Sequence, residues 1–141
     1  GAPFVLTPLS RTSDRARSMA LQITEALQAN PIWLDAETHD KILAATSHLP
    51  YLLSSALTLA ILDDAAPLIG PGFRSSTRLA GTPTSMMLGV LRTNRNNILS
   101  ALDRLKTQIT EIETVLQDED CTKLETILDL SHTRFQSLIR K

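Results

Sequence analysis

The sequence predicts an all-α protein, a bundle with two long helices. Of its 141 residues, 43% are hydrophobic and only 4% are aromatic, which is typical of packed helices and of a single domain. Apolar residues recur at helical spacing over long stretches, most clearly between Met86 and Leu116. Only two short stretches look extended: Phe4–Pro8 resembles a strand, and Ile32–Leu34 is too short to be more than a connector.

The first helix is expected from about Asp14 to Ala29. Ser10, Thr12 and Ser13 offer side chains that can cap its start, and Asn30-Pro31 marks its end. Its apolar face would consist of Met19, Ile23, Ala26 and Leu27.

A central helix is expected from Asp35, its N-cap, to about Asp63. Glu37 lies in the first turn, where the helix dipole favours an acidic side chain. Pro50 removes one backbone hydrogen bond and should kink the helix near His48. Such a kink can open space for a ligand or simply bend the helix around a core, and the sequence leaves both readings open.

Part of this helix imitates a membrane span. Between Ile42 and Leu62 the only acidic or basic side chain is His48, and the segment is long enough to cross a bilayer. Several hydroxyl side chains and Pro50 dilute its apolar surface, and no Lys/Arg cluster flanks it. We therefore expect no membrane, but a helix buried on nearly all sides inside a domain or a dimer.

The third part of the chain should contain a loop, a short helix and a very long helix. The loop spans Pro67–Gly72, and the short helix Phe73–Ala80 ends at Gly81. The apolar pattern from Met86 to Leu116 predicts one helix of about 30 residues. A compact monomer of this size cannot cover so long a stripe, so we expect an intertwined homodimer. After a break at Gln117–Asp120, the final helix contains Leu124, Ile127, Leu128, Phe135, Leu138 and Ile139.

Two groups of polar residues form a candidate site for a small anionic substrate. Arg74 and Arg78 are four residues apart after the glycine-containing loop, a spacing suited to holding carboxylates. Ser47, His48 and Tyr51 lie on the central helix near Asp40. Both arginines can equally be surface charges, and His48, in an almost uncharged stretch, is more typical of a hydrogen-bonded core residue than of a catalyst.

Other binding functions are not expected. The net charge of −1 argues against nucleic acid and anionic membranes as partners. His39 and Asp40 should point about 100° apart on a helix, and His132 lies on another helix, so we expect no metal site. Cys121 is the only cysteine and follows three acidic residues, which indicates a reducing cytoplasm and an unreactive thiol.

Four motifs in order carry a family resemblance. They are His39-Asp40, Ser47-His48-Leu49-Pro50, the run Gly70-x-Gly72-Phe73-Arg74-x-x-Thr77-Arg78, and a later helix with Asn94, Asn96 and Asn97. From Pro3 to about Arg140 the chain resembles the carboxy-terminal dimerisation domain of prephenate and arogenate dehydrogenases.

The resemblance implies a function in tyrosine biosynthesis. These enzymes transfer a hydride from prephenate or arogenate to NAD or NADP while a carboxylate leaves as carbon dioxide, and their general base belongs to the nucleotide-binding domain. It implies no catalytic residue here, Arg78 as the substrate-binding arginine, a weaker match for Arg74, and Ser47 and His48 facing the pocket. The chain departs from common family residues at three positions: Tyr51 for His, Ser75 for Asp and Met87 for Trp.

No glycine-rich nucleotide-binding motif is present. We therefore expect residues 1–8 to be the end of a nucleotide-binding domain or a linker, and 9–141 to be the helical dimerisation domain. The isolated fragment should bind no NAD or NADP and be inactive. Two alternatives remain, namely arogenate as the substrate and a purely structural dimerisation module.

Overall fold

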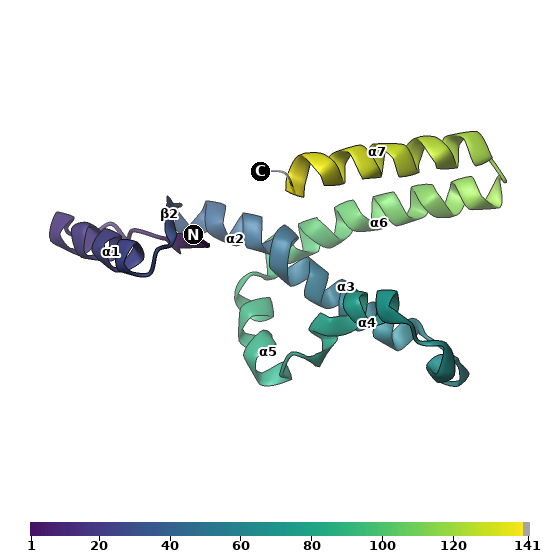
Figure 1. Ribbon diagram of the computed structural model, residues 1–141, viewed down its shortest axis with the longest axis horizontal. Coiled ribbons are helices and arrows are strands. Elements are labelled where there is room, and N and C mark those ends of the chain that lie inside the picture. The colour runs from purple at the N-terminus through teal and green to yellow at the C-terminus, as the bar shows by residue number, and fades with distance from the viewer. Residues whose placement is uncertain (140–141) are drawn as a thin grey trace. The chain divides into compact units, whose positions relative to one another are not determined.

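The computed structural model describes residues 1–139 and is almost entirely helical, which confirms the all-α prediction (Figure 1). The last residue of the expected resemblance, Arg140, lies outside the described residues. The chain divides into two compact units, Gly1–Ile98 and a second unit that begins at Leu99. The elements of the first unit are β1 (Pro3–Leu6), α1 (Asp14–Ala26), β2 (Asn30–Trp33), α2 (Ala36–Leu43), η1 (Ala44–His48), α3 (Leu49–Ala60), η2 (Asp63–Leu68), α4 (Pro71–Thr77), η3 (Arg78–Gly81) and α5 (Thr84–Thr93).

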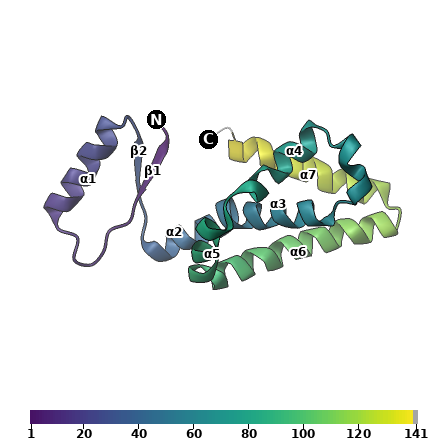
Figure 2. The same cartoon turned by 90° about the horizontal axis from the view of Figure 1, so that it is seen from below.

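The amino-terminal segment forms a small β–α–β unit, which corrects two sequence predictions. β1 and β2 pair in parallel, with Pro3 opposite Asn30 and Leu6 opposite Trp33, so the expected connector is a strand. Figure 2 shows the two strands side by side, with α1 as their crossover connection. Ser13 caps α1 as expected. The helix ends at Ala26, earlier than predicted, because the chain turns at Gln28 (φ 52°) to enter β2.

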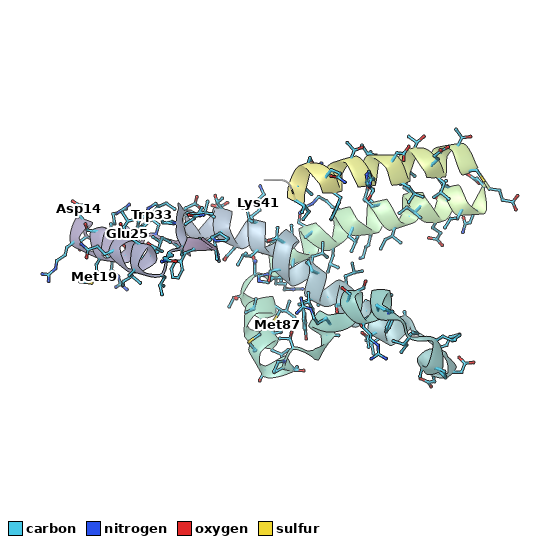
Figure 3. All side chains as sticks on the ribbon, viewed as in Figure 1. Asp14, Met19, Glu25, Trp33, Lys41 and Met87 are labelled. Carbon is cyan, nitrogen blue, oxygen red and sulfur yellow. The ribbon has the colours of Figure 1, made fainter. Side chains whose placement is uncertain are left out.

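Trp33, at the end of β2, faces α1. The guanidinium of Arg17 lies 5.6 Å from the centroid of the indole ring, a cation–π contact between helix and strand (Figure 3). Most side chains of the two strands nevertheless remain exposed, including Phe4, Val5 and Ile32.

The central helix starts where its cap predicts, and its regular hydrogen-bond pattern is interrupted just before Pro50. The Asp35 carboxylate accepts hydrogen bonds from the Thr38 amide at 2.8 Å and the Thr38 hydroxyl at 2.7 Å. The segment η1 is π-helical, and the Leu49 amide donates to the Ala44 carbonyl five residues earlier. Pro50 follows directly, at the first turn of α3. The helix ends at Ala60, three residues before the predicted Asp63, because Ile61 is extended and η2 begins.

The run Ala36–Ala60 is long and apolar enough to cross a membrane by length and composition, a property that core helices of soluble proteins share. Within this chain only 17% of its most apolar window is buried, so the prediction of burial on nearly all sides is not met by one chain. Leu53, Leu57 and Leu59 are all exposed.

The prediction of one continuous 30-residue helix is wrong, because the helix is broken at Asn94. α5 ends at Thr93, and α6 spans Arg95–Gln117. Asn94 leaves the helical conformation (φ −105°, ψ 23°), and its side chain bonds to other parts of the first unit. The partners of this amide lie in α2 and η1, so an apolar periodicity cannot indicate the break.

The second unit is a helical hairpin. The rest of α6 and α7 (Cys121–Ile139) lie side by side and are joined by a turn in which Glu119 has a positive φ of 53° (Figure 1). This turn confirms the break predicted at Gln117–Asp120. Val115 is only 2% exposed, yet much of the apolar surface of both helices is open: Leu99, Ile109, Ile112, Leu116, Leu128, Leu130, Phe135, Leu138 and Ile139 are exposed.

Candidate functional site

A pocket of about 270 Å³ lies in the first unit. The central helix contributes Thr46, Ser47 and Tyr51, and the segments after α4 contribute Leu79, Thr82, Met86 and Met87. Hydroxyl groups and flexible thioethers therefore share its wall, which suits a small ligand with both an apolar ring and oxygen atoms. Two of the five predicted substrate-binding residues, Ser47 and Tyr51, belong to this lining.

Neither arginine is part of the pocket lining, but Arg78 directly precedes one of its residues. Arg74 is in α4, and Arg78 opens η3 directly before the pocket residue Leu79. Both side chains are exposed, and neither guanidinium pairs with a carboxylate within residues 1–139. An exposed guanidinium next to a pocket, such as that of Arg78, can hold a carboxylate that enters from solvent.

A buried hydroxyl connects the two walls of the pocket. Ser54 in α3 is 1% exposed, and its Oγ accepts a hydrogen bond from the Ala80 amide of η3 at 2.9 Å. Tyr51 lies one turn before Ser54 on α3, and Leu79 directly precedes Ala80 in η3. The bond therefore fixes the distance between the helix that carries Tyr51 and the turn that carries Arg78 and Leu79.

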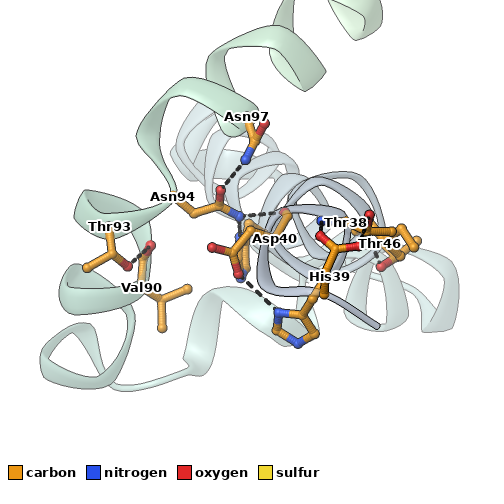
Figure 4. A network of polar contacts seen from close by, with 11 residues as sticks. Thr38, His39, Asp40, Thr46, Val90, Thr93, Asn94 and Asn97 are labelled. Atoms are coloured by element: carbon orange, nitrogen blue, oxygen red, sulfur yellow. Dashed lines mark hydrogen bonds and ion pairs between the residues drawn. The ribbon is translucent and has the colours of Figure 1, made fainter. Parts of the chain in front are cut away.

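His48, the fifth predicted residue, lies in a buried polar network and does not line the pocket. Its Nδ1 is 3.2 Å from Nδ2 of Asn94, which also donates to the Asp40 carbonyl at 2.7 Å (Figure 4). Burial lowers the pKa of His48 below its usual value; the nearby Asp40 carboxylate opposes this shift and His39 adds to it. His48 is thus held in its neutral form, as a core histidine would be.

His39 and Asp40 meet, contrary to the prediction that they diverge. Nδ1 of His39 lies 3.0 Å from Oδ1 of Asp40, because both side chains bend toward each other along the exposed side of α2. Within residues 1–139, no group of three His, Cys, Asp or Glu side chains is placed to hold a metal ion. The adjacent pair alone offers too few ligands for a structural or catalytic zinc site.

Sequence reasoning missed Ser54 and gave Asn94 no structural role. Ser54 is one of several hydroxyl residues in an apolar helix, and Asn94 stands in a run that reads as continuous helix. A polar residue inside an apolar helical stretch was the available signal, because such a group must find a partner when it is buried.

Comparison with known proteins identifies the family. The family model "Prephenate dehydrogenase, dimerization domain" matches residues 35–130. The chain belongs to this family. The resemblance inferred from the motifs is thereby confirmed.

Three relatives illustrate the match. The prephenate dehydrogenase of Bacillus subtilis (strain 168) is 26% identical over 127 residues, which cover 86% of this chain and 34% of the relative. A structure of Synechocystis arogenate dehydrogenase superposes with a TM-score of 0.83 at 22% identity, covering 96% of this chain and 52% of the other. A structure of prephenate dehydrogenase from A. aeolicus, in complex with hydroxyphenyl propionate and NAD+, gives 0.85 at 19% identity, covering 96% and 50%.

These solved structures establish the shared fold. The chain spans about a third of the length of the Bacillus relative and about half of the two solved chains.

Proposed function

We propose that this chain is the substrate-binding and dimerising part of a prephenate dehydrogenase, which converts prephenate to 4-hydroxyphenylpyruvate with NAD or NADP. The observation that carries the proposal is the pocket lined by Ser47 and Tyr51 next to the turn that begins with Arg78, in a chain of this family. The reaction moves a hydride from the ring carbon bearing the hydroxyl to the nicotinamide, and the ring carboxylate leaves as carbon dioxide.

In this proposal the residues of this chain position the substrate. Arg78 binds a substrate carboxylate, Arg74 adds a second positive charge, and the hydroxyls of Ser47 and Tyr51 contact the polar atoms of the ring or side chain. His48 directly follows the pocket residue Ser47 and connects this part of the central helix to Asn94. No residue here carries out proton transfer or binds the cofactor, so the nucleotide-binding domain supplies the general base and the site for NAD or NADP.

The β–α–β unit fits that nucleotide-binding domain better than the helical one. A parallel sheet of two strands with exposed Phe4, Val5 and Ile32 is too small to be stable alone, because parallel strands are normally covered on both faces. We therefore propose a boundary near Leu34 as an alternative to the one expected at residue 8. The family model, which starts at residue 35, supports this placement.

The dimer is supported by the uncovered apolar surface. Ile109, Ile112 and Leu116 line a shallow groove on α6, and further leucines on α3 and α7 are exposed. One chain leaves this surface in water, and the family is described as a dimerization domain. We propose a cytoplasmic homodimer that binds neither nucleic acid nor membranes and covers the apolar run Ala36–Ala60 with protein.

Arogenate is the second candidate substrate, favoured by the likeness to the Synechocystis arogenate dehydrogenase. Arogenate carries an amine where prephenate carries a keto group, so an acidic partner would favour it. Ser75 stands where many members have Asp, which leans toward prephenate. Steady-state kinetics with both substrates distinguishes the two by the ratio of their kcat/KM values.

The test of the proposal is Arg78→Ala in the enzyme that joins this chain to its nucleotide-binding domain. Loss of one charge-assisted contact should cost about 2 to 4 kcal/mol, or about 30- to 1000-fold in kcat/KM for prephenate, with cofactor affinity and folding unchanged. Arg74→Ala should lose less, because its match to the family is weaker.

Retention of more than about a third of the wild-type kcat/KM by Arg78→Ala would overturn the substrate-site assignment. The arginines would then be surface charges, and the structural-module alternative would explain the chain better. Circular dichroism of each variant separates a binding defect from misfolding.

A further inference from the structure

The buried network around Asn94 connects three segments of the first unit. Asn94 is 5% exposed and His48 is 6% exposed. Nδ2 of Asn94 contacts the Asp40 carbonyl of α2 and the His48 ring, while its Oδ1 accepts a hydrogen bond from Asn97 at 2.8 Å (Figure 4). Every polar atom of the Asn94 side chain is therefore engaged.

The π-helical segment explains how one amide reaches both partners. Asp40 and His48 are eight residues apart, and in a regular α-helix they would point about 80° apart. The extra residue in η1 rotates the following residues back by about 100° about the helix axis. Asp40 and His48 then lie on nearly the same side of the helix. Asn94, at the break between α5 and α6, faces that side.

The orientation of the Asn94 amide follows from its partners. A backbone carbonyl can only accept, so the group 2.7 Å from the Asp40 oxygen must be the NH₂ of Asn94 and cannot be its oxygen. The opposite orientation would place two acceptors in contact at Asp40 and two donors at Asn97. The same NH₂ then faces Nδ1 of His48 at 3.2 Å.

This orientation decides where His48 carries its proton. A nitrogen that faces an NH₂ donor must offer a lone pair, so Nδ1 is unprotonated and the single ring proton is on Nε2. Within residues 1–139, Nε2 makes no hydrogen bond, and no fully buried polar side-chain atom lacks a partner, so Nε2 retains some accessible surface.

We propose that Asn94 locks His48 as the neutral Nε2–H tautomer and so makes Nε2 the one hydrogen-bond donor of this ring. The proposal rests on the hydrogen-bond network alone. As a base His48 is doubly disfavoured, since Nε2 already carries a proton and a proton on Nδ1 would face the Asn94 NH₂. The charged or titratable groups near His48 are Asp40, which favours its protonation, and His39, which opposes it.

The first test is ¹⁵N NMR of the histidine rings in this chain at neutral pH. The chain has only three histidines, and His39 and His132 serve as internal references. We expect an unprotonated shift for Nδ1 of His48 and a protonated shift for Nε2. A proton on Nδ1, or a doubly protonated ring at neutral pH, would overturn the proposal without any variant being needed.

The second test replaces Asn94, the hydrogen-bond partner of His48. Asn94→Asp replaces the NH₂ by an acceptor, so the His48 ring should move its proton to Nδ1 or become doubly protonated. Asn96→Asp is the matched control, since it adds the same charge two residues later at an exposed side chain that makes no hydrogen bond in the described structure. Equal His48 spectra in the two variants would show that Asn94 does not set the tautomer. If Asn94→Asp does not fold, Asn94→Ala removes the NH₂ altogether, and a His48 spectrum equal to that of the wild type would likewise show that Asn94 does not set the tautomer.

Discussion

Side-chain hydrogen bonds that join distant residues occur in the unit Gly1–Ile98 and are absent from the described part of the second unit. In the first unit they connect Asn94 with Asp40 and His48, and Ser54 with Ala80, pairs separated by 26 to 54 residues. In the second unit each side-chain hydrogen bond spans three or four residues, as between Arg104 and Ser100. Beyond its helices, the second unit relies on apolar contacts.

The two kinds of contact suit two different functions, the positioning of a small ligand and the binding of a second subunit. A hydrogen bond has a narrow range of length and angle, so a network of them fixes atoms where a small ligand needs them. Apolar contact is not directional and grows with the area removed from water, which suits a surface awaiting a second subunit. We therefore propose that the first unit binds the ligand and that the second supplies much of the subunit contact.

The largest expected effect is on the apolar stripe of the second unit. Ile112→Asp should weaken the homodimer by about 100-fold in Kd, since symmetry places two carboxylates in the interface and each costs at least about 1.5 kcal/mol. Thr110→Asp adds the same charge on a different face of α6 and should leave the Kd within about threefold. Sedimentation over a range of concentrations measures both. A dimer that Ile112→Asp leaves intact would place the interface elsewhere.

A smaller effect is expected at the Ser54 bond of the first unit. Ser54→Ala leaves the partly buried Ala80 amide without its partner and should lower the free energy of unfolding by about 1 to 3 kcal/mol. Ser55→Ala is the matched control, because the Ser55 hydroxyl only donates to the Tyr51 carbonyl in its own helix and its loss should cost under about 0.5 kcal/mol. Urea denaturation at fixed protein concentration compares them. Similar values for both would mean that the bond across the pocket adds no stability.

The smallest effect is a pH dependence carried by His48. Its pKa is lowered from the usual 6.5 in the folded protein, so the unfolded chain takes up a proton first as the pH falls. This contribution to stability is complete above about pH 6.5 and declines below it. Thermal unfolding of wild type and His48→Gln between about pH 8 and pH 5 tests this. Parallel curves would show that His48 does not titrate differently on folding.

Local signals predicted the fold well where one side chain decides the structure. Ser13 and Asp35 start their helices as expected because a cap acts on amides two or three residues away. The pairing of β1 with β2 was missed because strands form through a partner 27 residues along the chain, and three apolar residues alone do not indicate it. The break at Asn94 was missed because its partners lie in α2 and η1.

The residues of the candidate site also fall into two groups, those that local motifs indicate and those whose roles depend on distant partners. The motifs pointed to Ser47 and Tyr51, which line the pocket, and to Arg78, which lies beside it. Their roles in binding remain predictions. The supports behind them, Ser54 and Asn94, act through bonds to residues 26 and 54 positions away, and a single sequence carries no periodicity at such separations.

The π-helical segment η1 also restricts how the gene can change. Deleting one codon within Ala44–His48 would restore regular α-helical hydrogen bonds and make the local backbone more ordinary. Every later residue of α3 would then turn by about 100° about the helix axis, carrying Tyr51 off the pocket wall and Ser54 away from Ala80. Evolution can therefore exchange side chains in this segment far more freely than it can alter its length.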